Sequence, residues 1–361
     1  MTLTSGPRKT LLRQETEEIP ESVARQAATG GPDLARAGAA LGDLDPALFV
    51  TAARGSSDHA ATYFKYLVEL LAGRPVASVG PSIASVYERP LALAGAACLS
   101  VSQSGKSPDL NAFQDMARAS GALTLALVNT RPSPLAQGAD LAIDICAGPE
   151  RAVAASKSYV CSLAAMAGIV GAWTQHPKMP EALAALPERL SLALSCDWSP
   201  LVEAAAGARS LYVIGRGPAF AIAQEAALKF KETCQIHAES YSSAEVIHGP
   251  IQLAAGGLVA LVFLSRDAAR PGLLQTAERL AAAGARVFVV DPLGADAARS
   301  GTALPRIALP FTALPCIAAP DPLLDPLSQI TAFYRFIDTL AGVRGFDPDA
   351  PQLLNKVTET L

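Results

Sequence analysis

Short apolar runs recur along this 361-residue chain, each followed by glycine or serine and then by a stretch with helical spacing. Clear examples are residues 97–101, 123–128 and 211–214, which are too short for buried helices and rich in Val, Ile and Leu. Such runs are typical of strands that are buried on both faces of a parallel sheet. The alternation of strand, turn and helix therefore predicts an α/β fold with doubly wound parallel sheets.

The alternation is interrupted once, near residues 177–200, and then starts again. Arg54-Gly55 follows the first predicted strand, and Arg216-Gly217 follows the first strand after the interruption. Two similar α/β domains in tandem account for this pattern economically. The predicted strands are residues 48–52, 75–79, 97–101, 123–128, 141–145, 211–214, 258–264, 286–290 and 306–309. The predicted domains are residues 21–195 and 196–345, with a loose N-terminal arm (1–20) and a C-terminal tail (346–361).

Composition excludes several classes of protein. The net charge of −4 provides no broad basic surface, so we expect no nucleic-acid partner. No run of about 18 apolar residues occurs, so we expect no membrane span. The six cysteines are scattered without CxxC spacing, as in a cytoplasmic protein with reduced thiols, and they predict neither a zinc site nor disulfides. Nothing in the sequence suggests a metal or redox cofactor.

Residues 102–107 read Ser-Gln-Ser-Gly-Lys-Ser, between a predicted buried strand and a helix that begins at Pro108. Backbone N–H groups at such a helix start, together with the three hydroxyls, suit an anion such as phosphate. The ending Gly-Lys-Ser resembles a P-loop, but a Walker motif requires glycine at position 100, where this chain has Ser100. We therefore predict phosphate binding without nucleotide hydrolysis.

A second polar group extends from Lys229 and Glu232, at the end of a predicted helix, to His248. Histidine exchanges protons near neutral pH, and a half-buried glutamate does so once burial raises its pKa. The group therefore suits acid–base catalysis, although a solvated helix end with charge pairs would look the same. A dinucleotide loop is excluded, because Phe220 stands where the third glycine is needed.

On these motifs the chain resembles the tandem SIS (sugar isomerase) domains of enzymes that act on amino-sugar phosphates. The resemblance extends from about residue 14 to the end of the chain. It includes the isomerase half of glutamine–fructose-6-phosphate aminotransferase and the SIS-type glucosamine-6-phosphate deaminases. The matching motifs are RGSS (54–57), SQSGKSPD (102–109), ERAVAASKSYV (150–160), EAALKFKE (225–232) and HAESYSSAEVIHGP (237–250). The resemblance implies two flavodoxin-like SIS domains, helices flanking each sheet, and a C-terminal lid.

The resemblance also implies a role for individual residues. Glu232 would move a proton between C1 and C2 of the sugar, Lys229 would support the sugar hydroxyls, and Lys356 would lie near the carbonyl. His248 would open the sugar ring from the neighbouring subunit, so a homodimer is expected. The implied phosphate ligands are Ser57, Ser102, Gln103, Ser104 and Ser107. The residues implied to line the sugar or to form the lid are Val153, Ala155 (serine in the synthase), Leu354 and Asn355.

Among these relatives the sequence favours a deaminase. The chain begins Met1-Thr2-Leu3 and its first cysteine is Cys98, so we expect no glutaminase domain. Lys106 stands where the synthase has glutamate. The expected reaction converts glucosamine 6-phosphate and water into fructose 6-phosphate and ammonia. The alternatives are galactosamine-6-phosphate deamination, isomerisation of a sugar phosphate, and a non-catalytic module that binds a sugar phosphate and regulates a partner.

Overall fold

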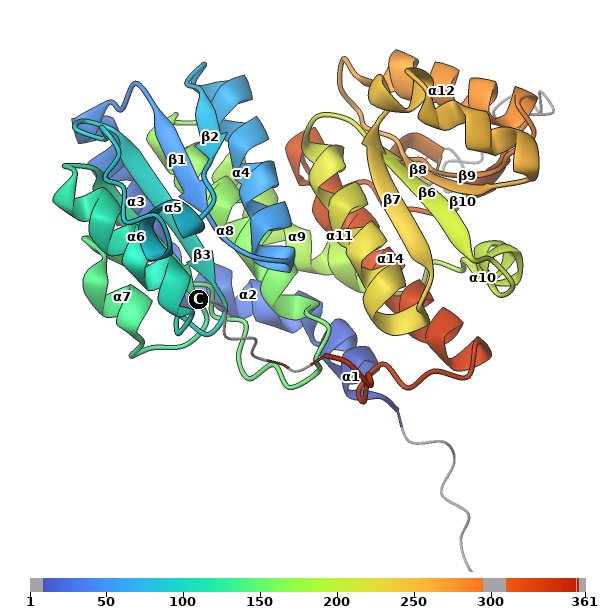
Figure 1. The fold of residues 1–361 in the computed structure, drawn as a ribbon, viewed down its shortest axis with the longest axis horizontal. Helices are drawn as coiled ribbons and strands as arrows, with labels where there is room; N and C mark the ends of the chain where they lie inside the picture. Colours follow the sequence, from blue (N-terminus) through green and yellow to red (C-terminus); the bar gives the residue numbers. More distant parts are fainter. Residues whose placement is uncertain (1–8, 295–309, 355, 357–361) are drawn as a thin grey trace, which may run out of the picture.

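The computed structural model describes residues 9–294, 310–354 and 356, and in these ranges the chain forms two five-stranded parallel sheets (Figure 1). The first sheet has the order β2-β1-β3-β4-β5 and the second has the order β10-β9-β8-β6-β7. The first contains β1 (Phe49–Ala52), β2 (Val76–Ser78), β3 (Ala97–Ser102), β4 (Leu123–Val128) and β5 (Leu141–Asp144). The second contains β6 (Ser210–Gly215), β7 (His237–Ser242), β8 (Val259–Phe263), β9 (Arg286–Val290) and β10 (Thr312–Leu314).

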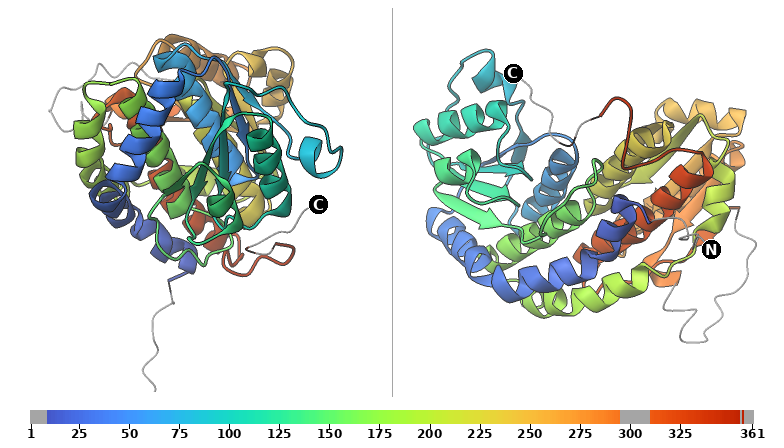
Figure 2. Two further views of the ribbon diagram at one scale, coloured as in Figure 1. Left: turned by 90° about the vertical axis from the view of Figure 1, so that its left-hand side faces the viewer. Right: turned by 90° about the horizontal axis from the view of Figure 1, so that it is seen from below.

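Helices cover both faces of each sheet (Figures 1 and 2). The helices of the first half are α1 (Leu11–Glu17), α2 (Ile19–Thr29), α3 (Gly31–Leu44), α4 (Ser56–Leu71), α5 (Ser82–Ser85), α6 (Pro108–Ala119), α7 (Pro134–Gly138), α8 (Lys157–Trp173) and α9 (Met179–Ala193). Those of the second half are α10 (Ser199–Ala205), α11 (Pro218–Cys234), α12 (Arg270–Ala282) and α14 (Asp325–Val343), with 3₁₀ turns η1 (Glu245–Ile247), η2 (Pro250–Gly256) and η3 (Pro322–Leu324).

The helices between the two sheets belong to one continuous core. Phe64 of α4, Phe230 of α11 and Phe333 of α14 lie in the same buried cluster as side chains from the inner faces of both sheets. The outer face of the first sheet packs on α6, around Phe113, and that of the second sheet packs on α12, around Leu273. The two halves are therefore joined by packing as well as by the chain.

The predicted fold is confirmed, with differences in detail. The two doubly wound parallel sheets are present, and most predicted strands lie within one or two residues of the observed ones. The strand predicted at 306–309 falls outside the described residues. The strand β7 was missed because its sequence, HAESYS, is polar and the strand lies at an edge of its sheet. The region near residues 177–200, where the predicted alternation is interrupted, contains α9, and Pro187 lies within that helix.

The prediction of a loose arm over residues 1–20 is wrong from Leu11 onward. Residues Leu11–Glu17 form α1, in which Leu12 and Glu15 are buried. The charged side chains that suggested a solvated arm make contacts with distant parts of the chain instead. Residues 1–8 lie outside the described part. The two helices that follow, α2 and α3, meet at Gly30.

Two kinds of feature are absent from the described ranges. No helix there is both long and apolar enough to cross a membrane. No group of three or more His, Cys, Asp or Glu side chains in those ranges is placed to bind a metal ion. All six cysteines are free thiols, four of them buried.

Candidate functional site

The predicted phosphate residues follow two neighbouring strands of the first sheet. Ser57 lies in the first turn of α4, directly after β1, and residues 102–107 connect β3 to α6. Strands β1 and β3 are adjacent, yet α4 packs on the inner face of the sheet and α6 on the outer face. This is the switch point at which doubly wound sheets bind ligands.

An ion pair joins these two loops. The guanidinium of Arg54 donates to Oδ2 of Asp109 through Nε at 2.9 Å and through Nη2 at 2.7 Å. The Asp109 side chain is buried at the start of α6. A charge-assisted pair of this kind holds geometry well, so the loop after β1 has a fixed position relative to the loop after β3.

The 102–107 loop is shaped by its own hydrogen bonds. Gly105 has φ +63°, and its N–H donates to Ser102 Oγ at 3.1 Å. The Lys106 N–H donates to Ser104 Oγ at 3.3 Å. Ser107 precedes α6 as its N-cap residue, but its side chain accepts no hydrogen bond from the helix, so that hydroxyl can face a ligand. The arrangement suits an anion at a helix start.

The acid–base group is centred on α11. Lys229 Nζ lies 2.5 Å from Glu232 Oε2, 3.3 Å from Glu225 Oε1 and 3.1 Å from Ser56 Oγ. The Lys229 side chain is 1% exposed, whereas that of Glu232 is 22% exposed. Ser56 is adjacent to Ser57, so the lysine links α11 to the predicted phosphate loops. Glu232 is thus a partly exposed carboxylate whose position a buried ammonium fixes, and a base that transfers protons must be both accessible and correctly placed.

Opposite charges keep the buried members of this group ionised. Burial alone would lower the pKa of Lys229, but the carboxylates of Glu225 and Glu232 outweigh it and raise that pKa above its ordinary value. Burial likewise opposes ionisation of Glu225, yet Lys229, His59 and the Tyr334 hydroxyl lower its pKa below the ordinary value. Lys229 therefore remains a cation throughout the physiological range.

Glu225 is a residue to which the sequence analysis gave no role. Its side chain is fully buried, and it accepts hydrogen bonds from Ser56 Oγ at 3.1 Å and from Tyr334 Oη at 2.9 Å. His59 Nδ1 lies 3.0 Å from its other oxygen. The available signal was the i,i+4 spacing of Glu225 and Lys229, but this spacing is common on exposed helices as well.

The predicted sugar-lining residues Val153 and Ala155 lie in the loop before α8, which Glu150 holds in place. The buried Glu150 carboxylate accepts N–H bonds from Ser156 at 3.1 Å and from Ser158 at 3.0 Å, and the Ser158 hydroxyl at 2.7 Å. Lys356 Nζ, from the tail, lies 3.0 Å from Glu150 Oε2. The structure thus brings Lys356 to this loop through a carboxylate that the sequence analysis did not single out.

Helix α1 supports the same loop from outside. The carboxylate of Glu15 accepts hydrogen bonds from the backbone N–H groups of Arg151 and Ala152. Glu18, which follows α1, lies 2.5 Å from Lys157 Nζ at the start of α8. Segments more than 130 residues apart in sequence are therefore joined here, which is why this part of the N-terminus is ordered.

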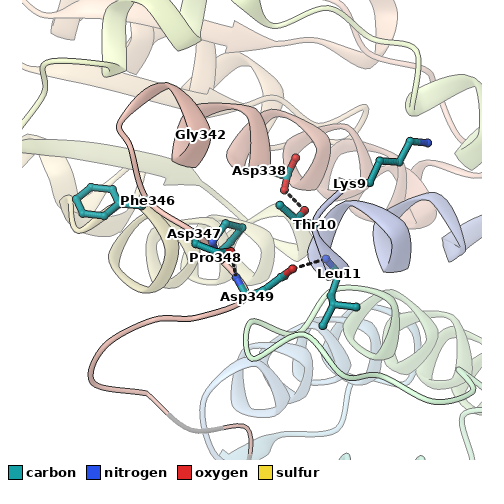
Figure 3. A pocket seen from close by; sticks show the side chains of 9 residues that line it. All are labelled: Lys9, Thr10, Leu11, Asp338, Gly342, Phe346, Asp347, Pro348 and Asp349. Atoms are coloured by element: carbon teal, nitrogen blue, oxygen red, sulfur yellow. Dashed lines mark hydrogen bonds between the residues drawn. The ribbon is translucent and has the colours of Figure 1, made fainter. Parts of the chain in front are cut away.

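The tail is anchored where it leaves α14 (Figure 3). Asp349 Oδ1 accepts the Leu12 N–H at 3.0 Å, and Oδ2 accepts the Leu11 N–H. Leu11 and Asp349 border a pocket of about 510 Å³ between the tail, α1 and α14. Beyond this anchor the tail continues past the exposed Leu354 to Lys356. Asn355, the other predicted lid residue, lies outside the described residues.

The structure does not bring His248 to Glu232. His248 is exposed directly after η1, whose Val246 packs in the outer cluster of the second sheet with residues of α12. Helix α11 packs on the inner face of the same sheet, where Phe230 belongs to the shared core. The sheet therefore stands between the η1 segment and α11, and His248 of one chain is separated from that chain's Glu232.

The tight turn at Gly105 generates a first prediction. A Cβ at this position would lie 2.3 Å from Ser133 Oγ, whereas a Cβ at Gly73, which has a similar φ of +64°, would meet nothing within 4 Å. Both substitutions to alanine carry the strain of positive φ, about 1 kcal/mol. Gly105→Ala should cost a further 1–3 kcal/mol or so of unfolding free energy, because it overpacks the loop.

Urea titration of the Gly73→Ala and Gly105→Ala variants measures this difference. Calorimetry with a hexose 6-phosphate should also show weaker binding for Gly105→Ala alone. Equal unfolding free energies for the two variants would contradict the loop geometry described above.

A second prediction concerns two carboxylates that hold the same loop. The Lys356 ammonium and the serine donors overcome burial and hold the pKa of Glu150 below its ordinary value of 4.5, whereas burial raises the pKa of Glu15. Stability from Glu150 is therefore present above pH 4.5 and is lost as the pH falls below it. The stability contributed by Glu15 has the opposite sign, because it decreases as the pH rises above 4.5.

Denaturant titrations of Glu150→Gln and Glu15→Gln between about pH 3.5 and pH 7 test this contrast. The destabilisation caused by Glu150→Gln should grow with rising pH, and that caused by Glu15→Gln should shrink. A common direction for both variants would show that one of the two environments is misassigned.

Comparison with known proteins identifies the family. The SIS domain model matches residues 48–169 and 206–300. Over 96% of its length the chain is 31% identical to a glutamine–fructose-6-phosphate aminotransferase of Leifsonia xyli subsp. xyli (strain CTCB07). The chain spans 58% of the length of that relative.

Two solved structures agree in fold. A protein from Silicibacter pomeroyi DSS-3, provisionally described as a phosphosugar isomerase, is 45% identical, with a TM-score of 0.87 over 94% of this chain and 100% of that one. The glucosamine-6-phosphate deaminase of Thermotoga maritima is 16% identical, with a TM-score of 0.76 over 97% of this chain and 100% of that one, and this similarity concerns the fold alone. The first matched segment contains all five strands of the first sheet, and the second contains four of the five strands of the second sheet, so the chain belongs to the SIS domain family.

Proposed function

We propose that this protein is an amino-sugar phosphate deaminase or isomerase, which moves a proton between C1 and C2 of its substrate. The observation that carries the proposal is a partly exposed carboxylate, Glu232, paired with the buried ammonium of Lys229 and linked through Ser56 to the serine-rich loops. Such a reaction requires a base that moves the proton and, in the same site, a loop that binds the phosphate and orients the sugar. The similarity to the Silicibacter protein, described as a phosphosugar isomerase, supports a sugar phosphate as the substrate.

In the proposed reaction the phosphate binds to Ser57 and to the 102–107 loop, away from the reacting carbons. The bound phosphate orients the sugar, so that C1 and C2 lie against Glu232. The carboxylate removes the proton from C2 and returns it to C1. The ammonium of Lys229 stays charged and can stabilise negative charge that develops on a sugar oxygen. Lys356, beside the loop that contains Val153 and Ala155, would approach the carbonyl end of the sugar.

The specific reaction that we propose is deamination of glucosamine 6-phosphate. Proton transfer from C2 to C1 of the opened amino sugar produces an imine at C2, and water then replaces the nitrogen. Fructose 6-phosphate and ammonia are released, so all atoms are conserved and no oxidant is needed. The motifs of residues 106–109 and 154–159 support this choice over the aminotransferase. Turnover of galactosamine 6-phosphate, or isomerisation without ammonia, would identify the alternatives.

We further propose that the active unit is a homodimer in which His248 opens the ring of a sugar bound to the partner. A histidine exchanges protons near pH 7, as ring opening requires. The support is the position of η1, on the far side of the second sheet from Glu232. One chain by itself would lack the ring-opening group at its own base.

Ammonia release from glucosamine 6-phosphate tests the proposed reaction. The parent protein should release ammonia and fructose 6-phosphate in equal amounts, and Glu232→Gln should lower kcat by roughly 10²-fold or more, because the amide cannot accept the proton. The exposed Glu181 on α9 provides the control variant Glu181→Gln, which should retain parental activity. A Glu232→Gln variant with the parental kcat would show that Glu232 is not the base.

Mixing two inactive variants tests the shared site. A heterodimer of Glu232→Gln and His248→Ala chains contains one intact site out of two, so random exchange of subunits should restore about a quarter of the parental activity. The two variant chains are co-expressed with different tags. The activity of each variant alone is then compared with that of the mixture. Mixtures no more active than either variant alone would place both groups in the site of a single chain.

A further inference from the structure

We propose that Glu225 is a positioning residue for the base Glu232, and that His59 makes this positioning depend on pH. The inference rests on the proposed function. Neither residue has a part in the reaction as described above, yet both lie in the contact between α4 and α11, where the two halves meet. The strength of Glu232 as a base depends on which groups share the ammonium of Lys229.

Lys229 Nζ is divided between two carboxylates of unlike exposure. Glu225 Oε1 lies 3.3 Å away and fully buried, and Glu232 Oε2 lies 2.5 Å away and partly open to solvent. Ser56 Oγ, at 3.1 Å from the same nitrogen, is bonded to Glu225 as well. Since Glu225 is fixed by partners from α4 and α14, it keeps the ammonium shared between the two carboxylates.

The division of charge determines how available Glu232 is as a base. Two carboxylates and one ammonium carry a net charge of −1 while His59 is neutral. A neutral side chain at position 225 would leave the ammonium to Glu232 alone and strengthen the existing ion pair between them, which makes the carboxylate a weaker base. Protonation of His59, 3.0 Å from Glu225 Oε2, would act in the same direction, because the imidazolium compensates the charge of Glu225.

The surroundings of His59 contain the groups that such a titration involves. Glu225 and Lys229 face it from α11, and Glu232 follows through Lys229. The Tyr334 hydroxyl of α14 and Tyr159 of α8 lie around the same carboxylate. Asp58 neighbours His59 on its own helix and interacts with it electrostatically. The His59 side chain is 18% exposed, so protons can reach it from solvent.

Glu225→Gln tests the positioning role, because loss of positioning should lower kcat and leave KM nearly unchanged. The amide preserves shape but removes the charge, so kcat should fall about 10- to 100-fold while KM changes less than about threefold. Tyr334→Phe is the second variant, because it removes only the hydroxyl that donates to Glu225 and should lower kcat a few-fold. Parental kcat in a folded Glu225→Gln variant, or in Tyr334→Phe should Glu225→Gln not fold, would overturn the proposal.

His59→Asn tests the dependence on pH. Asparagine can keep an N–H donor near Glu225 but cannot take up a proton, so the variant should retain more of its activity than the parent when the pH is lowered from about 8 to about 6. The control is His176→Asn, at a histidine between α8 and α9, where the profile should be unchanged. Identical dependence of activity on pH in the parent and in His59→Asn would show that His59 does not make the positioning of Glu232 depend on pH.

Crystal structures separate failure of this inference from failure of the proposed function. A parent protein without turnover of any amino-sugar phosphate would refute the function alone. The structure of Glu225→Gln then decides the inference: a Lys229 Nζ that moves away from the side chain at position 225 while it keeps its contact with Glu232 supports it, and an unmoved Lys229 overturns it. Where the parent is active, the kinetic and structural results must agree for the inference to stand.

Discussion

A carboxylate and an ammonium that are both removed from water lie where the two halves of this protein meet. Burying charges costs several kcal/mol for each ion unless partners replace the lost hydration. Glu225 and Lys229 replace it with each other and with side chains from α4, α11 and α14. The register of α11 against α4 is therefore specified, because a slide of one turn would leave both charges without partners. The positions of Ser56 and Glu232 follow from that register.

Much of the fold could be predicted from the sequence because it depends on local signals. Strands such as Leu123–Val128 are buried almost entirely on both faces, and an unbroken apolar run of that length is typical of a parallel sheet. The turn at Gly105 and the helix start at Pro108 indicated the position of the proposed phosphate loop. By contrast β7 was missed, since an edge strand is half-exposed and needs no apolar run. Helix α1 was missed because its charged residues suggested solvent.

The features of the site that could not be predicted from the sequence are tertiary contacts. Glu225 and Lys229 have the spacing of an ordinary surface ion pair, and only packing against α4 and α14 reveals that they are buried. The partner of Lys356 is Glu150, 206 residues away, and no local pattern indicates such a pairing. The position of His248 also depends on the sheet, because a residue after an edge strand can return along either face. Burial and long-range pairing are properties of the assembled layers.

The continuous core has a consequence for how such a chain arose. Leu99 of β3 and Val213 of β6 belong to one buried cluster, although they come from different repeats. Each repeat thus covers the inner apolar face of the other, and neither has a complete core of its own. An ancestor with a single repeat would have exposed that face to water unless two copies associated. Duplication and fusion would then have made permanent a pairing that already existed between separate chains, with the ion pair of Glu225 and Lys229 added at the seam.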